Sequence, residues 1–221
     1  MDPILIKELL ILLAAYMFGS IPFSVLLGTK IKGIDVREHG SGNPGGTNSI
    51  RWLGKTLGLS IVFLDAFKGG LIILLVRFGV LELSFIDPLL FGVVGAIGHV
   101  YPVFLKFKGG KAVAATAGML VGYNPIWATI AIIVFFVVIR ISKYVSIGST
   151  SIPITMILLS IIWGVFGIQI LPSLTTGSFW IHEIPYFVFM LALIVFRHQS
   201  NYRNIRNGVE PPVKWAQKKA A

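Results

Sequence analysis

Two glycine-rich segments that also carry basic residues stand out as the parts of the chain able to do chemistry. Residues 40–48 read GSGNPGGTN and are followed by Arg51, and residues 108–111 read KGGK. Glycine lets successive backbone N–H groups turn into one hollow, and such a hollow beside a cation binds an anionic oxygen. The sequence therefore predicts two phosphate-binding loops.

The first segment combines conformational freedom with short polar side chains. Its glycines allow positive φ angles and a close approach of the backbone to a ligand. Arg51 can form two parallel hydrogen bonds with one oxyanion. The polar side chains are those of Ser41, Asn43, Thr47 and Asn48. An ordinary surface turn starting at Asn43-Pro44 is the alternative, and the absence of a Walker pattern excludes a nucleotide P-loop.

The second segment follows His99-Val100-Tyr101-Pro102 and contains Gly109, Gly110 and Lys111. A second anion-binding loop on the same membrane side as the first would give a site for two phosphates. The alternative is a helix that ends at the two glycines, with lysines that extend toward the membrane surface.

A third group lies after the last apolar run, where His198 and Asn201 are three residues apart and would share a helical face. His198 is a candidate general base or phosphate ligand, or else part of a cationic helix end that complements the helix dipole. Ser146 and Ser149 begin another apolar run, where serine also commonly caps a helix.

Asp65 and Lys68 fall midway along an apolar run and can pair across one helical turn, which favours a structural ion pair over catalysis. The chain has no cysteine, and its four histidines are scattered. We therefore predict no metal site, no disulfide and no thiol nucleophile.

The composition predicts an all-α polytopic membrane protein, because 55% of the residues are hydrophobic and only 13% are charged. The net charge of +10 lies in loops and helix ends, where it would face anionic lipids or substrates, and no nucleic-acid recognition pattern accompanies it. We expect one domain over residues 1–221. The expected spans are residues 4–27, 57–76, 88–105, 112–123, 126–139, 152–171 and 184–196.

Seven spans form a bundle that puts every basic loop, both glycine-rich segments and the tail (197–221) on the cytoplasmic side, with the N-terminus outside. The fourth span is short. Six spans result if it joins the fifth, and five if the two form a re-entrant hairpin.

Residues 40–51, 98–111 and 197–210 together resemble one family, the bacterial membrane acyl-phosphate:glycerol-3-phosphate acyltransferases, or PlsY family. Residues 34–37 and 65–69 also resemble it. The resemblance implies transfer of a fatty acyl group from acyl phosphate to the 1-hydroxyl of glycerol 3-phosphate. The products would be lysophosphatidic acid and phosphate, in the first acylation step of phospholipid synthesis at the cytoplasmic membrane. It implies no acyl-CoA and no cofactor, and a functional link to an enzyme that produces acyl phosphate.

The resemblance also implies roles for individual residues. Essential or catalytic positions would be Ser41, Arg51, His198 and Asn201. The phosphate of acyl phosphate would be bound by Gly42, Asn43, Gly45, Gly46, Thr47 and Asn48. Glycerol 3-phosphate would be bound by Gly109, Gly110 and Lys111. We also assign Ser146 and Ser149 to this substrate, because they begin an apolar run on the same side of the membrane. Glu210 resembles a position linked to structural integrity.

Three positions depart from the family pattern. Gly46 stands where alanine is usual, Ala112 where glycine is usual, and Asn204 where arginine is common. A methyl group at Ala112 would narrow the second loop or require a negative φ angle. Two rival functions remain at this point: a transporter or channel for phosphate esters, and a structural membrane scaffold.

Overall fold

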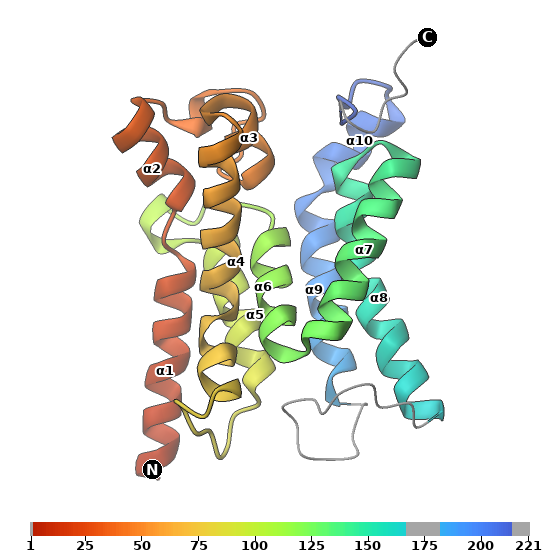
Figure 1. Cartoon of the computed structure of the whole chain (residues 1–221). Coiled ribbons are helices and arrows are strands. Elements are labelled where there is room, and N and C mark those ends of the chain that lie inside the picture. The colour runs from red at the N-terminus through yellow and green to blue at the C-terminus, as the bar shows by residue number, and fades with distance from the viewer. Residues whose placement is uncertain (1, 167–181, 214–221) are drawn as a thin grey trace. The chain divides into compact units, whose positions relative to one another are not determined.

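The computed structural model describes residues 2–166 and 182–213, and every regular element within those ranges is helical. The chain divides into two compact units, Met1–Tyr123 and Asn124–Ala221. Figure 1 shows the helices of each unit running alongside one another. The predicted all-α class is confirmed.

The first unit is built around α4, which packs against α6, α5 and α3, while α1 packs against α5. Its elements are α1 (Pro3–Gly19), α2 (Phe23–Lys32), η1 (Val36–Glu38), α3 (Gly46–Leu53), α4 (Lys55–Arg77), α5 (Pro88–Val100), η2 (Val103–Leu105) and α6 (Val113–Tyr123). The α4–α6 pair is close because small residues line it. A Cβ on Gly69 would overlap the backbone of Ala115, and one on Gly118 would overlap the backbone of Ala66.

In the second unit, α8 packs against α7 and against α9. Its helices are α7 (Pro125–Ser142), α8 (Val145–Phe166), α9 (Ile184–Arg197) and α10 (Gln199–Arg206). The last five residues of the predicted span 152–171 lie outside the described residues. The chain end returns to the loop after α7, where the Val213 N–H donates to the Lys143 carbonyl oxygen over 2.9 Å.

Five helical segments in the described ranges are long and apolar enough to cross a membrane. They are Pro3–Lys32, Lys55–Arg77, Pro88–Leu105, Pro125–Ser142 and Val145–Phe166. The helices α6 and α9, of 11 and 14 residues, are apolar but shorter. The polytopic membrane class agrees with this, while seven as the number of spans and their orientation stay predictions.

The first predicted span, residues 4–27, is interrupted in the structure. Helix α1 ends at Gly19 and α2 begins at Phe23. Pro22 has no N–H to continue the helix, and its ring disfavours the helical conformation at Ile21. The interruption leaves the Ile21 carbonyl oxygen outside the helical hydrogen bonds, and the Lys68 ammonium donates to it over 2.7 Å.

At the other end of the first unit, the buried side chain of Glu8 holds the loop between α4 and α5. Its carboxylate accepts hydrogen bonds from the backbone N–H groups of Ser84, Phe85 and Ile86. These donors precede Pro88 at the start of α5. One charged side chain on α1 therefore satisfies three backbone groups that would otherwise need water.

Replacing Glu8 should destabilise the protein without touching either glycine-rich loop. Glu8→Ala leaves three N–H groups without their acceptor, and we expect a loss of about 1–3 kcal/mol. Glu8→Gln retains one acceptor oxygen and should cost less. Thermal unfolding in detergent measures both, and equal midpoints for Glu8→Ala and the unmodified protein would contradict this role.

Candidate functional site

The first glycine-rich segment forms a loop that leads from η1 into α3. Gly40 and Gly42 have φ angles of 60° and 67°, in the left-handed region that favours glycine. The Gly42 N–H donates to the His39 carbonyl oxygen over 3.0 Å. A Cβ on Gly40 would lie 2.5 Å from both Asn48 Oδ1 and Trp52 Nε1, so this position needs glycine for space as well as for conformation.

Asn48 fastens this loop from inside. Its side chain is 3% exposed, and its Nδ2 donates to the carbonyl oxygens of Val36 at 2.8 Å and His39 at 3.0 Å. Its Oδ1 accepts from the Ser41 N–H at 3.3 Å. The amide is therefore engaged within the loop, which makes Asn48 a residue that shapes the loop, while its predicted contact with acyl phosphate stays untested.

The loop ends at the N-terminus of α3. Gly45 occupies the N-cap and provides no side-chain capping bond, and the first N–H groups of a helix have no acceptor within the helix. Ser41 and Thr47 are exposed at this terminus, and Arg51 is exposed one turn after Thr47, in the last turn of α3 on the same helical face. Backbone donors, hydroxyls and a guanidinium at a positive helix end are what a phosphate group requires.

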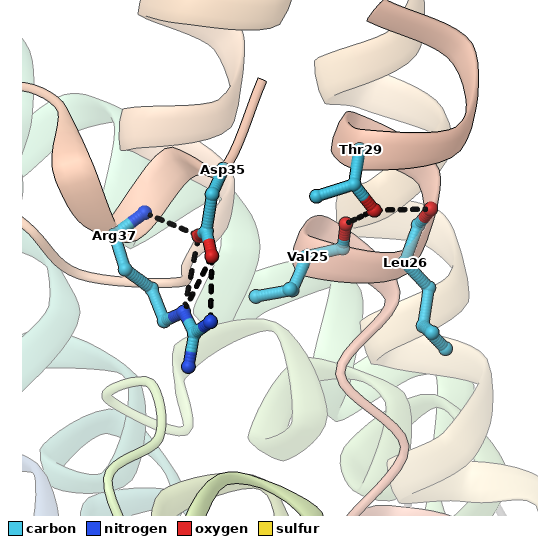
Figure 2. Close-up of polar contacts among 5 residues, drawn as sticks. All are labelled: Val25, Leu26, Thr29, Asp35 and Arg37. Carbon is cyan, nitrogen blue, oxygen red and sulfur yellow. Dashed lines mark hydrogen bonds and ion pairs between the residues drawn. The ribbon is translucent and has the colours of Figure 1, made fainter. Parts of the chain in front are cut away.

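Arg37, a second arginine near the loop, is already paired. Its side chain forms a fork with the Asp35 carboxylate, with Nε–Oδ1 at 3.0 Å and a second bond to Oδ2, and its own N–H donates to Oδ1 at 2.9 Å (Figure 2). These hydrogen bonds from the Arg37 side chain hold the pKa of Asp35 below its usual value. Within the described ranges Arg51 makes no ion pair. Its positive charge is therefore not neutralised by a carboxylate of the described residues, whereas that of Arg37 is.

The second glycine-rich segment is tied back onto the end of α5. The N–H groups of Gly109 and Gly110 donate to the carbonyl oxygens of Val100 and His99, each over 3.0 Å. A Cβ on Gly110 would overlap the His99 ring. These two glycines therefore serve close packing, and their N–H groups are engaged within the protein instead of lining an open hollow. Binding of an anion by Gly109, Gly110 and Lys111 stays a prediction.

Ala112 has a φ angle of 63° and is fully buried. The sequence suggested a narrowed loop or a negative φ angle at this position, and the structure has a positive one. Its carbonyl oxygen accepts from the Thr116 N–H at 2.8 Å and the Thr116 hydroxyl at 2.7 Å, so the start of α6 holds this conformation. An alanine in the left-handed region is strained where glycine would not be.

The remaining predicted site residues belong to the second unit. His198 is 3% exposed, and its Nδ1 lies 2.8 Å from the Ile194 carbonyl oxygen. A carbonyl oxygen only accepts, so this hydrogen bond places a proton on Nδ1. A neutral histidine in that tautomer can accept a proton through Nε2.

Glu210 orients Asn201. The Asn201 Nδ2 donates to one carboxylate oxygen of Glu210 at 2.6 Å, and the Asn204 Nδ2 donates to the other at 3.3 Å. Asn204, which stands where the family commonly has arginine, therefore contacts the same acid as Asn201 does.

Ser146 and Ser149 lie in the first turns of α8 and not at its cap, so the capping alternative does not describe them. Both are buried. The Ser149 hydroxyl donates to the Val145 carbonyl oxygen at 2.8 Å, whereas the Ser146 Oγ has no hydrogen-bond partner among the described residues. Tyr202, which the sequence analysis did not single out, shares a 2.5 Å hydrogen bond with Thr150 on the same helix.

The structure thus sorts the predicted residues into two sets. The first unit brings both glycine-rich loops together, since Pro44 of one and Gly109 and Gly110 of the other line the same small cavity. The second unit holds Ser146, Ser149, His198 and Asn201. Among the described residues, no group of three or more acidic, cysteine or histidine side chains has the arrangement of a metal site.

Comparison with known proteins identifies the family to which the chain is similar. A family model described as glycerol-3-phosphate acyltransferase matches residues 9–208. A glycerol-3-phosphate acyltransferase of Geobacillus kaustophilus is 40% identical over 214 residues, which cover 96% of this chain and 98% of the relative. One of Bacillus subtilis is 37% identical over 209 residues, which cover 93% and 97%.

Two solved structures of a glycerol 3-phosphate acyltransferase are also similar to this chain. The crystal structure of PlsY, an integral membrane glycerol 3-phosphate acyltransferase, in its glycerol 3-phosphate form has a TM-score of 0.76 and 31% identity, covering 94% of this chain and 96% of that one. Its lysophosphatidic acid form has a TM-score of 0.73 and 30% identity, covering 93% and 95%.

The strain at Ala112 predicts a stabilising substitution. Ala112→Gly removes the clash of the methyl group in the left-handed region, and we expect a gain of about 1 kcal/mol after the added freedom of the unfolded chain is subtracted. Thermal unfolding in detergent measures the gain. Ala115→Gly, inside α6 and equally buried, is the control and should destabilise; a loss of stability in both variants would show that Ala112 is not strained.

The Asp35–Arg37 pair predicts a pH dependence. Because the pKa of Asp35 is lowered in the folded protein, its contribution to stability is complete above about pH 4, the unfolded value, and is lost as the pH falls through the lower folded value. The stability difference between the unmodified protein and Asp35→Asn should therefore shrink on going from pH 6 to pH 3. A difference that stays constant across that range would argue against the pair.

Proposed function

The chain belongs to the glycerol-3-phosphate acyltransferase family, and from this membership we propose that its acyl donor is acyl phosphate. The proposed reaction transfers the fatty acyl group to the 1-hydroxyl of sn-glycerol 3-phosphate and gives lysophosphatidic acid and inorganic phosphate. The observation that carries the proposal is the first loop, in which Ser41 and Thr47 are exposed at the N-terminus of α3 and Arg51 is exposed one turn after Thr47 on the same helical face. A binding site of this kind suits a phosphate group that leaves as a dianion.

In the proposed site, the N–H groups at the start of α3 and the Arg51 guanidinium bind the phosphate of the donor. Two hydrogen-bond donors of different kinds on one leaving group stabilise the charge that develops as the acyl–oxygen bond breaks. Lys111, Ser146 and Ser149 bind the phosphate of the acceptor. Positive charge on both sides is needed because the two substrates are anions that repel each other.

The chemistry is a direct attack. The glycerol oxygen forms a bond with the acyl carbon, the bond from that carbon to the phosphate oxygen breaks, and the hydroxyl proton passes to His198 Nε2 or to a substrate phosphate oxygen. Acyl phosphate is a mixed anhydride with a good leaving group, so orientation and charge neutralisation remain the main demands on the protein. Ser41 donates a hydrogen bond and does not become acylated, and Asn201, oriented by Glu210, positions the acceptor.

This reaction needs no cofactor and no metal. We propose that the protein lies in the cytoplasmic membrane, with its site and C-terminus on the cytoplasmic side and its N-terminus outside. The reaction also requires an enzyme that supplies acyl phosphate. Both the donor and the product are lipids, so the surrounding membrane is part of the working environment.

The test is acyl transfer by the purified protein with acyl phosphate and glycerol 3-phosphate and no CoA. We expect stoichiometric lysophosphatidic acid and phosphate. Product formed only when acyl-CoA is supplied would reject the donor assignment. Ligand flux in proteoliposomes without any product would instead identify a transporter of phosphate esters.

Substitutions then test the roles. Arg51→Ala should lower kcat by about 100- to 1,000-fold because it removes a donor to the leaving phosphate. His198→Ala should lower kcat by about 100-fold or more if His198 is the base, and much less if a substrate phosphate accepts the proton. Lys55→Ala, also exposed and four residues after Arg51, is the matched control and should leave kcat within twofold.

Mass spectrometry that finds an acylated Ser41 after a single turnover would refute direct attack.

A further inference from the structure

The first unit contains a buried polar cluster that the proposed reaction does not use. Its members are Asp65 and Lys68 of α4 and His99 of α5, which are 2%, 5% and 6% exposed. Lys68 Nζ lies 2.9 Å from Asp65 Oδ1, which confirms the ion pair that the sequence predicted, and His99 Nδ1 lies 3.5 Å from the same oxygen. Ionisable groups inside a membrane helix are costly, so such a cluster calls for a functional explanation.

One arm of the cluster leads to the first loop. Besides its contact with Asp65, Lys68 donates to the Ile21 carbonyl oxygen at the interruption between α1 and α2. Helix α2 starts at Phe23, and the buried hydroxyl of Ser24 in its first turn donates to the Pro44 carbonyl oxygen over 3.0 Å. Pro44 directly precedes the glycines at the start of α3. The position of the first loop is therefore linked to Lys68 through a short rigid segment.

The other arm leads to the second loop. His99 contacts Asp65 through Nδ1, its carbonyl oxygen accepts the Gly110 N–H, and its ring lies where a Cβ on Gly110 would be. The small cavity between the two loops is lined by Pro44, Gly109 and Gly110 together with all three members of the cluster. Asp65 is thus the one residue that both arms share.

We propose that Asp65, Lys68 and His99 are positioning residues that set the spacing between the two glycine-rich loops. Lys68 fixes the first loop, His99 fixes the second, and the Asp65 carboxylate holds both. The kinetic part of this inference rests on the proposed function, in which the first loop binds the acyl donor and the second binds glycerol 3-phosphate.

The experiment measures backbone hydrogen exchange in the full-length protein in nanodiscs, in peptides covering residues 39–48 and 106–112. Lys68→Met should raise exchange mainly in the first peptide, His99→Leu mainly in the second, and Asp65→Asn in both. Glu8→Gln is the control, since it alters a buried charge of the same unit that contacts neither loop. Equal changes in both peptides for Lys68→Met and His99→Leu, or changes no larger than in the control, would overturn the proposal.

Steady-state kinetics provide the second readout. A displaced loop should raise the KM of its own substrate, so Lys68→Met should raise KM for the donor and His99→Leu should raise KM for glycerol 3-phosphate. Asp65→Asn should affect both KM values and lower kcat by up to about 100-fold. A fall in kcat with both KM values unchanged in all three variants would overturn the assignment of separate arms.

The proposal stays testable if a variant does not fold or if the proposed reaction is not observed. If Lys68→Met does not yield folded protein, the double variant Asp65→Asn, Lys68→Met leaves no unpaired buried charge and should fold while losing protection in both peptides. If the unmodified protein forms no product from acyl phosphate, the donor assignment fails, whereas the exchange pattern still decides whether the cluster positions the loops.

Discussion

The hydrogen bond from the Lys68 ammonium to the Ile21 carbonyl oxygen is the interaction on which the organisation of the first unit depends. Pro22 interrupts the first membrane helix, and the backbone groups at the interruption need hydrogen-bond partners because water is excluded from an apolar environment. The Ile21 carbonyl oxygen accepts from the Phe23 N–H over 3.1 Å and also from Lys68, which ties it to the neighbouring α4. The interruption lets α2 leave the direction of α1 and bring Ser24 to the backbone of the first loop. The interruption of the first helix thereby supports the first glycine-rich loop.

The two glycine-rich loops look alike in sequence and use glycine for different physical reasons. In the first loop, Gly40 and Gly42 adopt positive φ angles, and the backbone turns around the side chain of Asn48. In the second loop, Gly109 and Gly110 are needed because the chain passes directly over the end of α5 and the His99 ring. A glycine-rich composition therefore predicts that the loop backbone passes close to other atoms, but it does not tell whether these atoms belong to a ligand or to the protein itself. The second loop packs on the protein's own backbone, so the proposed phosphate site at α3 is the better supported of the two.

The all-α membrane class could be predicted because long apolar runs follow directly from the membrane environment. The ion pair between Asp65 and Lys68 could also be predicted, because a spacing of three residues places both side chains on one helical face. The interruption at Pro22 was missed because residues 4–27 are predominantly apolar on both sides of this proline, so the hydropathy of the segment gave no sign of a break. The engagement of Asn48 and of the Gly109 and Gly110 N–H groups depends on tertiary contacts between segments far apart in the chain. Sequence spacing carries no information about such contacts.

The buried cluster is better explained by orientation than by stability. Removing two charges from water costs several kcal/mol per ion, and well-packed apolar side chains at the same positions are often as stabilising or more so. An apolar pair, however, has no ammonium group to tie the Ile21 carbonyl oxygen to α4 and no charged group to hold the His99 ring against Gly110. Directional contacts of this kind fix two backbone segments relative to one helix, whereas hydrophobic packing alone tolerates small shifts. The proposed reaction brings two anions together and depends on distances of this kind, so the proposed positioning role gives a reason for a costly ionic cluster that contacts both loops.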